Sequence, residues 1–218
     1  MDKYDKECKL KVYLMHKKGI ANRLTNVLNL LYSCKAVDCI EIVTSESSGV
    51  VFADKAERSS LLPSDFPNKE LSIQEKSIFH KQYKALQKIS QDGVPSIILE
   101  DDVIFDSTEF DLFVDEIYSF SCDWDFVFFG TGCNLSIPGS GFVQNNNRLK
   151  SKCADSMVVD PSAAKKIIED MNTYKAVSPI DWDLNYRFIK MNMKVYWYEP
   201  GITTQGSQRG IYKSEIQQ

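Results

Sequence analysis

The stretch PSIILEDDVIF, residues 95–105, places three acidic residues directly after an apolar run. The apolar residues predict a buried strand, and Glu100, Asp101 and Asp102 stand at its carboxyl end. In open parallel sheets, ligands bind beyond the carboxyl ends of the strands. Because side chains alternate along a strand, we expect Glu100 and Asp102 on one side and Asp101 on the other. Carboxylates so placed suit Mg²⁺ or Mn²⁺, and an ordinary solvated turn is the alternative.

The segments around this stretch alternate between predicted strands and predicted helices. Ser72 and Glu75 form a capping-box pattern at the start of one of these helices. Strands are expected at 9–15, 39–46, 95–105, 123–131, 154–160 and 194–200, and helices at 20–34, 72–90, 111–120, 161–172 and 179–192. Residues 53–70 are expected to be irregular, 133–150 to form a loop or hairpin, and 201–218 to form a glycine-broken tail. The alternation predicts an α/β fold with a mostly parallel central sheet flanked by helices, organised as a single domain over 1–218.

Composition excludes several classes of protein. The chain has 218 residues, 43% hydrophobic content and a net charge of −4, which gives no electrostatic reason to bind nucleic acid or anionic membranes. No stretch approaches the roughly 20 apolar residues of a membrane span. The charged N-terminus lacks the apolar core of a signal peptide, so we expect a cytoplasmic protein. Six scattered cysteines without a CxxC pair are expected to be reduced thiols and do not indicate a zinc cluster.

Two further segments carry candidate functional residues. In PIDWDLN, residues 179–185, Asp181 is predicted to cap a helix and Asp183 to lie in its first turn. A carboxylate there either caps the helix or acts as a general base in a concave site. In GIANRL, residues 19–24, Gly19 and the following helix N-terminus offer backbone N–H groups to an anion, and Arg23 adds a phosphate-binding fork. The alternative is a glycine turn with an exposed arginine.

These segments together resemble glycosyltransferase family 25, the lipopolysaccharide-type and procollagen-type galactosyltransferases. LSIQEKSIFHKQYKALQKI is similar to the family's LSxGExxCxxSHxxxWxxI helix, and SIILEDDVIF to its ILEDD segment. DWDFVFFG, ADSMVVDPSAAKKII, PIDWDL and the closing EPGITTQGSQRGIYKSEI resemble the segments that follow, in the family's order. The resemblance covers residues 71–215. The Ser-His pair of the family helix falls on Lys81 and Gln82, while His80 stands two positions early.

The resemblance implies a GT-A fold, a nucleotide sugar as the donor, with UDP-sugars first among the candidates, and Mn²⁺ or Mg²⁺ as the cofactor. It implies an inverting transferase that moves a hexose to a hydroxyl of a glycan, lipopolysaccharide or glycoprotein acceptor. Asp102, with Glu100, is expected to bind the metal, and Asp181 or Asp183 to be the catalytic base. The residues expected to bind the nucleotide sugar are Gly19, Asn22, Arg23, Ser45, Glu100, Asp101, Gln205, Ser207 and Arg209. Trp182, Trp124 and Tyr212 offer apolar faces to sugar rings.

The resemblance also divides the single domain by task. The N-terminal part is expected to bind the donor nucleotide, and the C-terminal part to supply the acceptor side and a flexible tail. For a viral member of the family, the expected compartment is the host cytoplasm. Two other functions stay open. One is a Mg²⁺-dependent phosphohydrolase or nucleotidyltransferase, which also places carboxylates at strand ends, and the other is a non-catalytic module that binds sugar nucleotides.

Overall fold

The computed structural model describes residues 10–44, 47, 49–61, 69–146 and 152–213. Its helices are α1 (Ala21–Ser33), α2 (Lys55–Leu61), α3 (Ile73–Asp92), α4 (Ser107–Ser119), α5 (Pro161–Thr173) and α6 (Ile180–Lys190), with a 3₁₀ turn η1 (Gly132–Asn134). Its strands are β1 (Leu10–Met15), β2 (Val37–Val43), β3 (Ser96–Glu100), β4 (Val103–Phe105), β5 (Phe126–Phe128), β6 (Gly141–Gln144), β7 (Ser156–Val159), β8 (Val195–Glu199) and β9 (Thr203–Gln205). None of the helices described is long and apolar enough to cross a bilayer.

One central sheet of the described residues runs in the order β2-β1-β3-β7-β5-β8-β6. The pairs β1–β2, β1–β3 and β5–β8 are parallel, whereas β3–β7, β5–β7 and β6–β8 are antiparallel. The prediction of an α/β fold with a central sheet flanked by helices is confirmed, and the sheet is mixed. As a result, the carboxyl ends of β1 and β3 share one edge with the amino end of β7.

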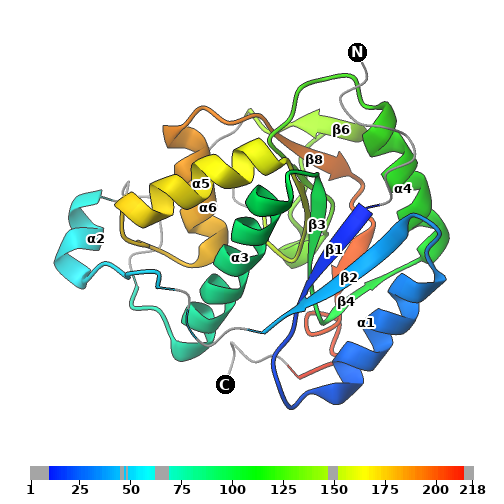
Figure 1. The fold of residues 1–218 in the computed structure, drawn as a ribbon, viewed down its shortest axis with the longest axis horizontal. Coiled ribbons are helices and arrows are strands. Elements are labelled where there is room, and N and C mark those ends of the chain that lie inside the picture. The colour runs from blue at the N-terminus through cyan, green and yellow to red at the C-terminus, as the bar shows by residue number, and fades with distance from the viewer. Residues whose placement is uncertain (1–9, 45–46, 48, 62–68, 147–151, 214–218) are drawn as a thin grey trace.

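Helices cover both faces of this sheet (Figure 1). Figure 1 shows α3, α5 and α6 on one side and α1 and α4 on the other. The first face packs Tyr13 and Trp197 against side chains of α3, α5 and α6. The second packs Leu14 and Phe129 against α1 and α4. Because β1 and β3 lie between two apolar layers, both are buried along their length, which explains their nearly continuous apolar sequences.

Helix α3 begins as its sequence predicts. Ser72 is the N-cap, its hydroxyl accepts from Glu75 N at 3.2 Å, and the Glu75 carboxylate accepts from Ser72 N at 2.9 Å. Gly93 ends the helix in the left-handed conformation with φ 71°. An N-terminal cap of this kind contributes about 1 kcal/mol to the free energy of unfolding. It also holds Glu75 at the helix start, next to the edge of the sheet where the acids lie.

Four local predictions were wrong. The strand expected over 95–105 is interrupted, because residues 101 and 102 form a turn between β3 and β4, which belong to different sheets. Part of the segment expected to be irregular forms α2, capped by Asp54 through its carboxylate bond to Glu57 N. The tail expected to lack regular structure contains β9, which pairs with β4 in a separate two-stranded sheet. Asp181 is not the N-cap of α6, because Pro179 takes that position and Asp181 follows within the first turn.

Candidate functional site

A cleft of about 440 Å³ opens at the edge of the sheet where β1 and β3 end. This volume lies within the range of roughly 300–1,000 Å³ that is usual for small-molecule sites. Its walls come from the β1–α1 connection, α3, the acidic turn after β3, the segment before β7, the start of α6 and the segment after β9. The predicted site residues among its lining are Arg23, Glu100, Asp101, Asp102, Asp181, Gln205 and Ser207. Segments far apart in the sequence therefore meet around one space.

Asp101 connects the acidic turn, which comprises residues 100–102, to the segment that follows β1. Its carboxylate lies 2.6 Å from His16 Nδ1, accepts from Lys17 N at 3.3 Å, and lies 3.7 Å from Arg23 Nη1. The Arg23 guanidinium also donates to the backbone oxygen of Lys213 and lies over the ring of Tyr212. Asp101 therefore holds Arg23 at the cleft wall, and its negative charge compensates the positive charge of the guanidinium.

Glu100 and Asp102 instead contact the end of β9 and the segment after it. Gln205 Nε2 donates to Glu100 Oε2 at 3.1 Å, and Ser207 hydrogen-bonds to Asp102. Burial, followed by the neighbouring Asp102 charge, raises the pKa of Glu100 well above its ordinary value. Burial also raises the pKa of Asp102, while Ser207 and Arg23 act in the opposite direction. Asp102 lies in the turn after β3, so strand alternation does not apply to it, but its charge does influence Glu100.

Asp155 is a third carboxylate of this cluster that sequence reasoning missed. It directly precedes β7, and its backbone oxygen accepts from Glu100 N at 2.9 Å. Its side chain is fully buried, and neither carboxylate oxygen has a hydrogen-bond partner among the described residues. A Cβ on Gly130 would lie 2.6 Å from Asp155 Oδ1, so only glycine leaves room there. Burial raises the pKa of Asp155 to about 7, and the Asp102 charge adds to this shift.

Asp155→Asn is expected to stabilise the protein at neutral pH. The folded-state pKa of about 7 lies above the ordinary value of 3.8, so ionising this buried carboxyl costs stability at and above neutrality. Well below the ordinary pKa of 3.8, at about pH 3, the folded and unfolded chains both hold the proton, and the cost vanishes. In thermal melts with EDTA, Asp155→Asn should therefore melt about 5 °C higher than the unmodified protein at about pH 8, and this difference should shrink toward about pH 3.

The exposed Asp115 of α4 supplies the control for this measurement, since Asp115→Asn removes a charge that water already solvates. Its melting temperature should match that of the unmodified protein at every pH. A gain for Asp155→Asn that does not vary with pH, or a loss at about pH 8, would contradict the buried-charge explanation.

The carboxylate cluster fits a divalent cation only in part. Asp102 Oδ1 and both oxygens of Asp155 are buried without a hydrogen-bond partner in the described chain, and unpaired hard oxygen atoms are what Mg²⁺ and Mn²⁺ bind. Yet no three His, Cys, Asp or Glu side chains of the described residues are arranged to hold a metal by themselves. Mg²⁺ in nucleotide enzymes usually takes one or two carboxylates, with phosphate and water completing its shell. The residues present fit a cation held jointly with a phosphorylated ligand.

Asp181 and Asp183 have different surroundings although both lie in the first turn of α6. Asp181 lines the cleft with Trp182, and burial raises its pKa to about 6. Asp183 is fully buried outside the lining of the cleft. Its carboxylate accepts from Arg187 Nε at 2.6 Å and from Val177 N at 2.9 Å. Only Asp181 is therefore placed to meet a ligand in the cleft.

The fold is similar to that of a known glycosyltransferase. One similar solved structure is a glycosyltransferase involved in the glycosylation of the major capsid of PBCV-1, with a TM-score of 0.50 and 8% sequence identity over 91% of this chain and 92% of that chain. The glycosyltransferase GlyE of Streptococcus pneumoniae TIGR4 aligns with a TM-score of 0.45 and 10% identity, over 88% of this chain and 45% of that chain. No protein-family model and no curated protein sequence matches the chain. Likeness at 8% identity establishes the fold, and membership of family 25 stays a prediction.

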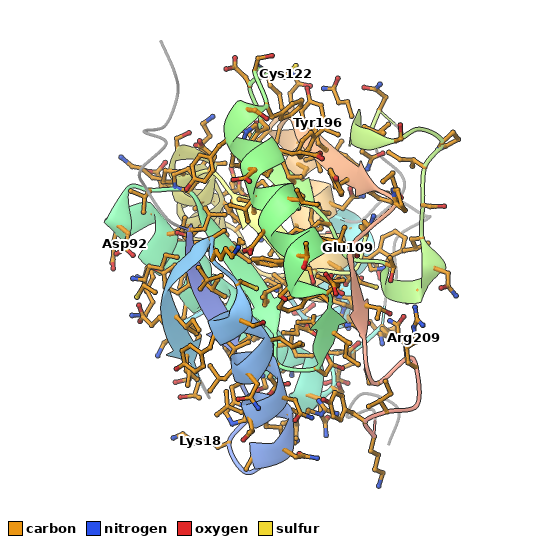
Figure 2. The ribbon with its side chains drawn as sticks, turned by 90° about the vertical axis from the view of Figure 1, so that its right-hand side faces the viewer. Lys18, Asp92, Glu109, Cys122, Tyr196 and Arg209 are labelled. Carbon is orange, nitrogen blue, oxygen red and sulfur yellow. The ribbon has the colours of Figure 1, made fainter. Side chains whose placement is uncertain are left out.

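Several predicted residues lie away from the lining of the cleft. Gly19 has φ +95°, as the turn before α1 requires, whereas Asn22 lies in the first turn of α1, where its Oδ1 accepts from Arg23 N. Arg209 lies on the outside of the molecule in Figure 2, with its Nε donating to Thr204 Oγ1 at 3.2 Å. Ser45 lies outside the described residues. Trp124 is a buried core residue, so its predicted role as a sugar platform is wrong.

Proposed function

We propose that the protein is a glycosyltransferase that uses a nucleoside-diphosphate sugar, with UDP-sugars as the first donors to test. One observation carries this proposal. Glu100, Asp102 and Asp181 come from segments about 80 residues apart, and all line a single cleft. A transferase needs one region that binds a diphosphate and a second that accepts a proton from an acceptor hydroxyl. The likeness in fold to a glycosyltransferase structure is consistent with this assignment.

The diphosphate side of the cleft is assigned to the acidic turn and Arg23. A divalent cation bound at Asp102, with Glu100 beside it, would neutralise the negative charge that develops on the departing nucleoside diphosphate. Asp155 is fully buried outside the lining of the cleft and is a third carboxyl group that influences Glu100. Arg23 contributes a planar guanidinium that matches phosphate oxygens. Its partner Asp101 keeps that guanidinium at the cleft wall.

The acceptor side is assigned to the start of α6. Asp181 would remove the proton from the attacking hydroxyl, and its pKa of about 6 leaves it mostly ionised at neutral pH. Trp182 next to it lines the cleft and offers an apolar face on which a sugar ring can stack. A base that faces the donor from the opposite wall suits direct displacement with inversion at the anomeric carbon. The proposed acceptor is a hydroxyl of a glycan, lipopolysaccharide or glycoprotein.

Thermal melts with a panel of nucleotide sugars, with and without MnCl₂, test the proposal. A ligand that binds only the folded state at 100 times its dissociation constant stabilises it by about 2.7 kcal/mol. This should raise the melting temperature by about 5–10 °C for UDP-sugars with Mn²⁺, and by less without the metal. The absence of a response to every donor would contradict the proposal.

A second assay separates the three functions. Incubation of the protein with the responding donor and Mn²⁺ should release free sugar slowly, because water replaces the acceptor. Release of phosphate from simple phosphomonoesters, without nucleotide-sugar binding, would favour a phosphohydrolase. Stabilisation by a donor without any turnover, over a panel of sugar acceptors, would favour a non-catalytic binding module.

A further inference from the structure

Two cysteines face each other on the wall of the cleft. Cys133 lies in η1 after β5, and Cys153 lies just before β7, with 3.5 Å between the two Sγ atoms. The antiparallel pairing of β5 with β7, in which Phe128 lies opposite Met157, brings these two segments together. Both side chains line the cleft, so a covalent change at this pair would occur beside the proposed reaction site.

The geometry of the pair is close to that of a disulfide. The S–S bond length is about 2.05 Å, so the two sulfurs need to approach each other by about 1.5 Å. The backbone before Cys133 already abuts Cys153, since a Cβ on Gly132 would lie 2.6 Å from Cys153 Cβ. Cys133 is exposed to solvent, whereas Cys153 is only partly exposed. A small oxidant can therefore reach the first thiol directly.

A chain of contacts connects Cys133 with the acidic turn. Cys133 N donates to Gln208 Oε1 at 2.7 Å, and Gln208 Nε2 lies 3.6 Å from Cys133 Sγ. Gln208 Nε2 also donates to Gln205 Oε1, and Gln205 Nε2 donates to Glu100 Oε2 at 3.1 Å. A disulfide with Cys153 changes the position of Cys133 Sγ and so disturbs its contact with Gln208 Nε2, the first link in this chain.

We propose that Cys133 and Cys153 form a reversible disulfide that loosens the turn around Gln208 at the cleft wall. The oxidant is a small-molecule disulfide such as glutathione disulfide. The Cys133 thiolate attacks one sulfur of that disulfide, whose S–S bond breaks to release the first glutathione thiolate. Cys153 then loses its proton and attacks the Cys133 sulfur, and this attack releases the second glutathione thiolate. Two cysteine thiols are oxidised by two electrons, and their two protons end on two glutathione thiols.

The order of the two steps follows from the surroundings of each thiol. Burial raises the pKa of the Cys153 thiol, so this residue is a poor first nucleophile toward an oxidant in solution. Once Cys133 carries the mixed disulfide, its sulfur lies next to Cys153, and proximity favours the second attack. Reduction by an excess of thiol reverses both steps.

Peptide mapping and hydrogen exchange test the proposal without any sugar or nucleotide. The whole protein is incubated with glutathione disulfide, digested without reductant, and analysed by mass spectrometry for a peptide pair joined at Cys133 and Cys153. Amide exchange is then compared between the oxidised and reduced protein at 203–213. We expect the cross-link to be the major intramolecular product, and exchange at 206–210 to be several-fold faster in the oxidised protein. Absence of the cross-link, or unchanged exchange in cross-linked protein, would overturn the proposal.

Two serine variants complete the test. Cys133→Ser replaces an exposed side chain and should lose both the cross-link and the oxidation-dependent change in exchange. Cys122→Ser is the matched control, because Cys122 is exposed and lies at the top of the molecule in Figure 2, away from Arg209. It should keep both effects. Faster exchange on oxidation of Cys133→Ser would show that another thiol is responsible. Failure of the transferase proposal would change none of these readouts.

Discussion

Replacing Asp102 with asparagine is expected to lower the rate of sugar transfer, or of donor hydrolysis, by about 1,000-fold. Asp102 Oδ1 is buried in the cleft wall without a hydrogen-bond partner among the described residues, so its charge is available to a bound cation. Asparagine keeps the size of the side chain and the contact with Ser207, but it removes the negative charge that attracts the cation. Initial rates at saturating donor and Mn²⁺ would measure the loss.

The same variant should lose the part of the UDP thermal shift that depends on Mn²⁺ and keep the part that does not. Asp115→Asn on the outer surface of α4 is the control for a change in net charge, and it should match the unmodified protein in both measurements. Full activity of Asp102→Asn, or a Mn²⁺ response equal to that of the control, would refute the assignment of Asp102 to the metal.

Asp181→Asn is expected to lower transfer by about 100- to 10,000-fold while leaving the affinity for UDP unchanged. The amide cannot take the proton of the acceptor hydroxyl, whereas the nucleotide is assigned to the opposite wall. The pKa of Asp181 is about 6, and only its ionised form is a base. The rate of the unmodified protein should therefore fall about tenfold for each pH unit below 6, and a pH profile of kcat/KM would measure this.

Asp183→Asn is the matched control from the same helical turn. It should retain transfer, because the Asp183 carboxylate contacts Arg187 and Val177 N inside the protein. It should also unfold more easily, by about 2 kcal/mol, since a hydrogen bond to a buried charged group is weakened. If the folded Asp183 variant lost transfer and the Asp181 variant kept it, the catalytic base would have to be reassigned.

Most of the fold follows from local signals in the chain. The Ser72–Glu75 capping box marks the start of α3, and the apolar run before Glu100 marks β3 and its acidic end. Strand direction was harder to predict, because central strands that are buried on both faces have the same apolar sequences in parallel and antiparallel pairs. The antiparallel direction of β7 could therefore not be predicted from its sequence SMVV, residues 156–159.

The candidate site was predictable where its residues lie in one segment, and not where distant segments meet. Asp155 carries no local signal, since a single aspartate before a strand resembles any turn residue. It joins Glu100 only because β7 pairs with β3. Asp181 and Asp183 were indistinguishable in sequence. Two positions along a helix correspond to a rotation of about 200°, so only one of them can face the cleft.

The sequence alone determined most of the strands and helices that build the central sheet and its two helical layers, and it placed three carboxylates at the end of a core strand. Both depend on interactions between residues that are near each other in the chain. Only the tertiary structure decided which carboxylates share the cleft, which aspartate of α6 is buried against Arg187, and which two of the cysteines meet. These features depend on the direction and order of the strands in the sheet, because that arrangement brings residues distant in sequence within a few ångströms of each other.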